Sequence, residues 1–210
     1  MGRPPSLTAE QRKEATKRRA QGATLQELAD SYALGPWSVL SQCWRATLHI
    51  ERGERAVGVP MLMSNLEVLR EARFALYRTQ FMGVLAAGFA FQGDLVRGLA
   101  AIDEALIHCK KREELWYLPE IFRLKGVILA LAENPEERLV EELFWQSLRC
   151  ARQQESLTWE LRAAMALATR QRLAGLIDRA RTTVADVYQR FTEGFGTVDL
   201  KAAQGLMTPS

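Results

Sequence analysis

Residues 81–106 constrain the fold more than any other stretch, because they contain two apolar helical faces on either side of a helix-breaking pair. The first face is formed by residues at helical spacing, namely Met82, Leu85, Ala86, Phe89 and Ala90. Gly93 and Asp94 then interrupt the helix, and a second face carries Leu99, Ile102, Ala105 and Leu106. Two such helices cannot bury both faces within one hairpin, so the pattern predicts further hairpins packed against it.

The order of small and large residues in this hairpin is specific. Gly98 falls where the second helix must approach the first closely, and it follows the Gly-Asp turn at a fixed distance. The pattern resembles a tetratricopeptide repeat, and the resemblance is carried by Leu85, Ala86, Phe89, Gly93, Asp94, Gly98, Ile102 and Ala105. It implies a pair of antiparallel helices in an all-α array.

Comparable breaks recur along the chain at Gly53, Gly93, Glu133 and Gly175, which are 40, 40 and 42 residues apart. This regular spacing predicts an all-α solenoid of about four tetratricopeptide-like repeats over residues 35–210. Pro60 falls inside the second helix of the first repeat and should bend it or cost roughly 3 kcal/mol. A last short helix, capped by Thr197, should close the array.

Three short motifs make the likeness of this region more specific. They are Trp-Tyr-Leu-Pro-Glu at 116–120, Trp-Glu-Leu-Arg-Ala-Ala at 159–164 and Phe-Thr-Glu-Gly-Phe at 191–195. With the repeats around them, residues 34–206 resemble the C-terminal repeat region of large bacterial multidomain regulators of the ATPase and adenylate-cyclase type. The resemblance implies regulation or signalling through a bound protein. The chain has no G-x-x-x-x-G-K-[ST] loop, so we expect no nucleotide hydrolysis.

Residues 1–34 have a different character. Within residues 1–21 the basic residues are Arg3, Arg12, Lys13, Lys17, Arg18 and Arg19, against Glu10 and Glu14. Thr8 should cap a helix that ends near Gln21, and Thr24 should cap a second helix through Ala29. The spacing of small and apolar residues from 29 to 39 fits a helix-turn-helix.

Residues 2–34 resemble the C-terminal DNA-binding segment of serine resolvases and invertases. This resemblance implies a Gly-Arg-Pro arm in the minor groove, basic residues on phosphates, and Ser38 and Gln42 near base edges. That family opens its recognition helix with small polar residues, where this chain has Pro36 and Trp37. We therefore expect at most weak, non-selective DNA binding.

No pattern in the sequence predicts catalysis or a bound cofactor. His49 and His108 fall in separate repeats, and neither belongs to a metal-ligand motif. The three cysteines are far apart and set in helical patterns, which favours small core residues over a disulfide or metal site. No signal peptide or membrane span is recognisable, so we expect a cytoplasmic protein without membrane, metal or cofactor partners.

The sequence thus predicts a non-enzymatic protein with a helix-turn-helix-like segment at 1–34 and a repeat array at 35–210. Its predicted function is to bind a protein partner or peptide segment in the groove formed by the first helices of the repeats. One alternative is a DNA-binding transcriptional regulator or resolvase-type protein acting through the N-terminal segment. A further alternative is a rearranged fragment of a larger ATPase regulator, because the resemblance changes abruptly at residues 33–34.

Overall fold

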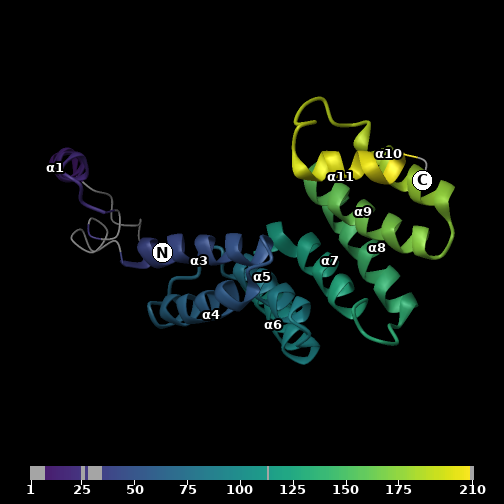
Figure 1. Ribbon diagram of the computed structural model, residues 1–210, viewed down its shortest axis with the longest axis horizontal. Helices are drawn as coiled ribbons and strands as arrows, with labels where there is room; N and C mark the ends of the chain where they lie inside the picture. The colour runs from purple at the N-terminus through teal and green to yellow at the C-terminus, as the bar shows by residue number, and fades with distance from the viewer. Residues whose placement is uncertain (1–7, 25–26, 28–34, 113, 209–210) are drawn as a thin grey trace. The chain divides into compact units, whose positions relative to one another are not determined.

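The computed structural model describes residues 8–24, 27, 35–112 and 114–208, and every regular element in these ranges is a helix (Figure 1). The predicted all-α fold is confirmed at that level. None of these helices combines the length and the apolar character needed to cross a membrane. The chain divides into two compact units, Met1–Leu76 and Tyr77–Ser210. Residues 35–76, which belong to the predicted repeat array, lie in the first of these units.

The first described helix of unit 1 is α1 (Ala9–Ala20), which begins where the sequence predicts. Thr8 accepts a hydrogen bond from the Gln11 amide, and the Gln11 side chain accepts one from the Thr8 amide, which forms a capping box. Thr24 and Glu27 exchange the same pair of bonds, as expected of a helix start at Thr24. The remainder of that predicted helix, the arm with Arg3 and residues 29–34 of the predicted helix-turn-helix lie outside the described residues.

Unit 1 also contains a helical hairpin of α3 (Gly35–Glu51) and α4 (Arg55–Glu71), which pack against each other. Gly58 lies directly against α3, since a Cβ atom there would come within 2.8 Å of the Ala46 carbonyl oxygen. The rings of Trp37 and Phe74 pack in a T-shaped arrangement, with their centroids 5.3 Å apart. The helix α4 continues through Pro60, which is exposed.

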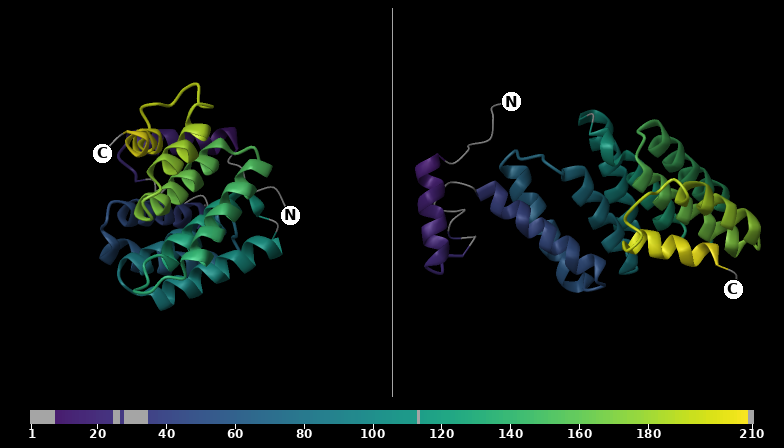
Figure 2. Two further views of the ribbon diagram at one scale, coloured as in Figure 1. Left: turned by 90° about the vertical axis from the view of Figure 1, so that its right-hand side faces the viewer. Right: turned by 90° about the horizontal axis from the view of Figure 1, so that it is seen from above.

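Unit 2 consists of three successive hairpins and a final helix (Figure 1). The helices pair as α5 (Arg78–Phe91) with α6 (Leu95–Arg112), α7 (Leu118–Leu129) with α8 (Glu137–Gln153), and α9 (Leu157–Leu173) with α10 (Ile177–Tyr188), followed by α11 (Val198–Met207). A short 3-10 helix, η1 (Leu115–Tyr117), leads into α7. The hairpins follow one another in chain order, as both views in Figure 2 show.

In unit 2, alternate helices also contact each other. The helix α7 contacts both α5 and α9, and α9 contacts α11. We call these four helices, α5, α7, α9 and α11, the first-helix layer. Side chains from different hairpins therefore come together on this layer although they are far apart in the sequence.

Two glycines allow the helices of a hairpin to approach closely. A Cβ atom on Gly98 of α6 would lie 3.0 Å from the Ala86 carbonyl oxygen, which explains the small residue predicted there. A Cβ atom on Gly126 of α7 would lie 2.6 Å from the Phe144 ring of α8. Replacing either glycine requires a neighbouring group to move.

The predicted Gly-Asp turn is also present. Gly93 has φ +90°, and the Asp94 amide donates to the Phe89 carbonyl over 3.0 Å, which closes the helix end as a Schellman turn does. Gly175 has φ +77° and forms the equivalent turn after α9. Both breaks follow from a left-handed backbone conformation that glycine adopts without strain.

Two details differ from the sequence-based expectations, and one further turn has an unusual backbone conformation. The helical pattern of residues 139–148 predicts that Leu139 faces inward, but its side chain is exposed. The buried stripe of α8 begins one residue later, at Val140. Thr197 stands at the start of α11 without capping it through its side chain. The turn before α9 uses Glu155 at φ +54°, a conformation that favours glycine.

The buried position of Ile102 in α6 makes a stability prediction. Its side chain is 0% exposed, so Ile102→Ala should lower the free energy of unfolding by about 2–5 kcal/mol. Val96→Ala on the same helix should change it by less than about 0.5 kcal/mol, because Val96 is 80% exposed. Urea unfolding measures both changes. Equal effects of the two substitutions would contradict the packing of α6 described above.

Candidate functional site

A buried carboxylate lies at the centre of the first-helix layer. Glu120 of α7 is 3% exposed and accepts two hydrogen bonds from Arg123, each 2.7 Å long. Arg162 of α9 donates to the same carboxylate from Nη1 over 3.2 Å. A charge so deeply buried needs such partners, because removal from water otherwise costs several kcal/mol.

Arg162 also extends the network to a third helix. Its Nε donates to Asp199 of α11 over 2.7 Å, so one guanidinium group joins α7, α9 and α11. Burial by itself would lower the pKa of Arg162, but the charge on Glu120 and the hydrogen bond to Asp199 outweigh it and raise the pKa above its ordinary value. Arg162 is therefore a fixed cation with its orientation set from both sides.

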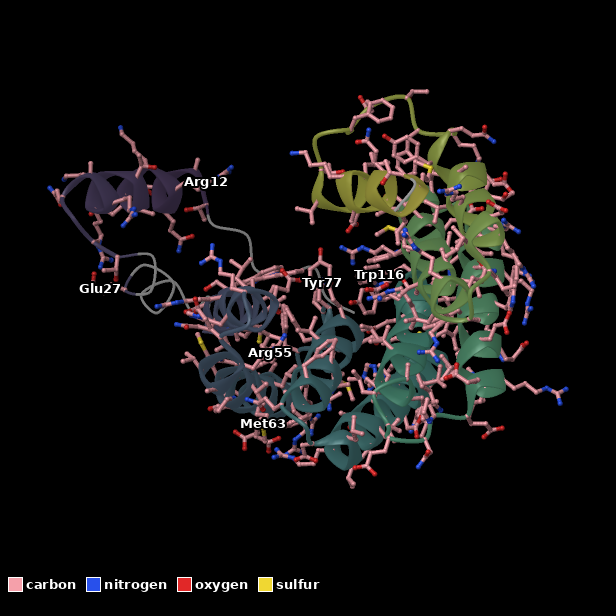
Figure 3. All side chains as sticks on the ribbon, turned by 45° about the vertical axis from the view of Figure 1, so that its right-hand side comes forward. Arg12, Glu27, Arg55, Met63, Tyr77 and Trp116 are labelled. Atoms are coloured by element: carbon pink, nitrogen blue, oxygen red, sulfur yellow. The ribbon has the colours of Figure 1, made fainter. Side chains whose placement is uncertain are left out.

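A series of aromatic rings continues from this network. Trp159 lies beneath the Arg162 guanidinium at 5.3 Å, and its ring meets that of Tyr117 edge-on at 5.4 Å. Trp116 follows at 5.1 Å from Tyr117, and Tyr77 follows at 6.0 Å from Trp116. Figure 3 shows Tyr77 and Trp116 next to each other. We call the residues Tyr77, Trp116, Tyr117, Glu120, Arg123, Trp159, Arg162 and Asp199 the aromatic–arginine face.

Part of this face is accessible to a binding partner. Trp116 is 44% exposed and Tyr77 is 37% exposed, whereas Tyr117 between Trp116 and Trp159 is buried. Arg162 uses Nε and Nη1 in its bonds to carboxylates, so Nη2 donates to no other residue in the described parts of the chain. The face offers flat apolar rings and a guanidinium donor, which are groups that suit binding.

A shallow cavity adjoins the face at its α11 end. It has a volume of about 300 Å³ and is lined by Thr158 and Leu161 of α9, by Asp199 and Leu200 of α11, and by Phe191 and Glu193 between them. The walls combine apolar side chains with two carboxylates. The cavity is large enough for one side chain of a bound segment.

One cluster resembles a catalytic arrangement of hydroxyl, imidazole and carboxylate, but its geometry is that of a buried core contact. Thr79 donates its hydroxyl proton to Glu114 over 2.6 Å, and His108 Nδ1 lies 3.2 Å from the Thr79 hydroxyl oxygen. The hydroxyl proton is thus directed at the carboxylate instead of the imidazole. Thr79 is also 0% exposed, so no substrate reaches it.

The cysteines have no feature of reactive thiols. Burial raises the pKa of Cys43 to about 12 and that of Cys109 to about 11, which keeps both thiols protonated near neutral pH. Burial also raises the pKa of Cys150. Within the described ranges, no three side chains of His, Cys, Asp or Glu come together as a metal site would require.

The residues predicted to contact DNA fall into three groups. Arg12, Lys13, Lys17 and Arg19 are exposed on α1, and Arg18 is half-buried. Ser38 is buried in α3 and Gln42 is half-buried, so the Ser38 hydroxyl does not reach the surface where a base would lie. Arg3 lies outside the described residues.

Sequence reasoning did not identify the ion network. Glu120 and Arg162 fall within the motifs at 116–120 and 159–164, but the sequence does not indicate that they meet. A signal was nevertheless present, since each is a charged residue among apolar neighbours in the first helix of its hairpin. Buried charges in such positions need partners from adjacent helices.

The half-buried histidine His108 predicts a pH dependence of stability. Burial lowers the pKa of His108 below 6.5, with Arg78 and Arg112 acting in the same direction and Glu114 and Glu104 opposing it. The folded state therefore binds this proton less readily than the unfolded state. This part of the stability is present above about pH 6.5 and is lost as the pH falls through the lower folded pKa.

Urea unfolding at several pH values between about 8 and 5 tests this in the wild type and in His108→Gln. The wild type should lose more stability on acidification than the variant does, because only the wild type takes up this proton. Parallel curves for the two proteins would show that His108 makes no such contribution.

Comparison with known proteins does not assign the chain to a family. No family model matches it, and no curated protein is significantly similar to it. Its function must be inferred from the geometry described above.

Proposed function

We propose that unit 2 is a tetratricopeptide-like helical-repeat module that binds an extended segment of a protein partner across the first-helix layer. The observation that carries this proposal is the aromatic–arginine face, where exposed Trp116 and Tyr77 continue into a guanidinium held by two carboxylates. Tryptophan, tyrosine and arginine are the residues that contribute most often to binding energy at protein interfaces. Helical arrays bind protein segments along such a surface.

The face is well suited to binding because its central groups are already ordered. Glu120 and Asp199 fix the Arg162 side chain, so a partner does not have to immobilise it on binding. The rings of Tyr117 and Trp159 fix one another in the same way. A partner segment could place an apolar side chain against Trp116 and accept a hydrogen bond from Nη2 of Arg162.

Selection from a phage-displayed library of random peptides tests this proposal, with the full chain as target. Peptides enriched on the wild type should bind Trp116→Ala at least tenfold more weakly, because an exposed aromatic anchor is removed. Trp44→Ala is the matched control, since Trp44 is a comparably exposed tryptophan of unit 1. It should leave the affinity unchanged. Failure to enrich any peptide, or equal binding to Trp116→Ala, would overturn the proposal.

DNA binding through α1 is a second candidate, favoured by one observation. The described part of this helix buries no residue, and its last turn carries Lys17, Arg18 and Arg19. Cations presented in this way can contact phosphates without reading bases. Figure 3 shows Arg12 projecting from the same helix.

Fluorescence anisotropy with a random-sequence duplex at two salt concentrations tests this candidate. Changing Lys17, Arg18 and Arg19 to Ala should weaken binding and flatten the logarithmic salt slope by up to about three units, one for each phosphate that the variant no longer neutralises. The matched control changes Lys110, Lys111 and Arg112, which form the basic last turn of α6. Equal weakening in both variants would indicate attraction to net charge alone and would refute a role for α1.

A further inference from the structure

A second cavity lies where the ends of three helices meet. It has a volume of about 480 Å³ and is bounded by the start of α8, the end of α9 and the start of α10. It shares no residue with the aromatic–arginine face. Its walls contain both unpartnered polar atoms and aliphatic side chains, which is typical of a ligand site.

Gln171 is the unusual polar group in this cavity. Its side chain is 97% removed from solvent, being 3% exposed. The Thr183 hydroxyl lies 3.0 Å from Oε1 and 2.8 Å from the Arg179 carbonyl oxygen, whereas Nε2 has no hydrogen-bond partner. A buried donor left without a partner costs about 1–3 kcal/mol, so such groups are rare in folded proteins unless something else binds them.

A second donor beside it is also unused. The Nε atom of Arg170 is buried without a partner, while its Nη2 pairs with Glu137 at the start of α8. Glu141 lines the same cavity and accepts a bond of 3.3 Å from Trp145. Gln171, Arg170 and the carboxylates Glu137 and Glu141 therefore line the same cavity.

The remaining lining determines the chemistry of the ligand. Glu137 and Glu141 balance Arg170 and Arg179 in formal charge, so the ligand need not carry a net charge. Leu167, Leu173 and Leu176 supply an aliphatic wall. A carboxamide offers an oxygen that can accept from Gln171 and an N–H that can donate to Glu141.

We propose that this cavity binds a neutral amide next to a short aliphatic group, with Gln171 as the main hydrogen-bonding residue. The amide can belong to a small free molecule or to the backbone of a peptide segment. Because the site lies apart from the aromatic–arginine face, it constitutes a second binding site of unit 2, and its occupancy does not depend on the function proposed for that face.

NMR titration of the full chain with N-acetylleucinamide tests the proposal, with N-acetylleucine as the negatively charged comparison. The amide should bind saturably and more tightly than the acid. If acetyl-Gly-Leu-Gly-Gly-amide binds more tightly than N-acetylleucinamide, the ligand is a peptide segment. If it binds equally or more weakly, the ligand is a small free amide. Preference for the acid would overturn the assignment of a neutral ligand.

Two variants test whether the cavity binds a ligand or whether Gln171 has only a structural role. Gln171→Met keeps the length and burial of the side chain but removes the amide, so the affinity for N-acetylleucinamide should fall at least tenfold without loss of thermal stability. Ala174→Phe starts from an exposed position and should block the cavity. Gln189→Met, at an exposed glutamine, is the control. Undiminished binding by the first two variants, or no saturable binding by the wild type, would overturn the proposal and leave the cavity with water only.

Discussion

The burial of the Glu120 carboxylate is the constraint on which the arrangement of unit 2 depends. At 3% exposure this carboxylate needs cationic donors around it, and Arg123 and Arg162 provide them. Arg162 comes from the next hairpin and binds Asp199 of α11 as well. This buried charge thus joins helices from separate hairpins. The network adds specificity to an apolar core that would otherwise tolerate small shifts.

Packing of small residues makes this arrangement possible. Gly98 and Gly126 let the two helices of a hairpin approach within contact of backbone or ring atoms, and the hairpins then stack through their alternate helices. The stacking brings Trp159 of α9 into one series with Trp116 and Tyr117 of η1, which are far from it in the sequence. The surface proposed to bind a partner is therefore a consequence of the fold, because no single hairpin contains it.

The sequence predicts features that depend on local structure. Glycine at 93 and 175 and apolar spacing in 81–106 predict turns and helices correctly, since backbone conformation and helical periodicity act within a few residues. Glu155 adopts the left-handed conformation at a helix end where the Ser156 amide donates to the Ala151 carbonyl, although it is not a glycine. Leu139 is exposed because it precedes the buried stripe of α8. The pairing of Glu120 with Arg162 and the unpartnered amide of Gln171 could not be predicted, because they depend on which helices become neighbours.

Hydrogen exchange in Arg162→Met tests most directly whether this guanidinium holds the first-helix layer together. Arg149→Met is the matched control, because Arg149 pairs with Glu142 within α8 alone. If Arg162 joins the three helices, amides of both α7 and α11 should exchange about tenfold faster in its variant, as expected for loss of charged hydrogen bonds, and those of the control should not. Faster exchange confined to α9, or no change at all, would contradict the account.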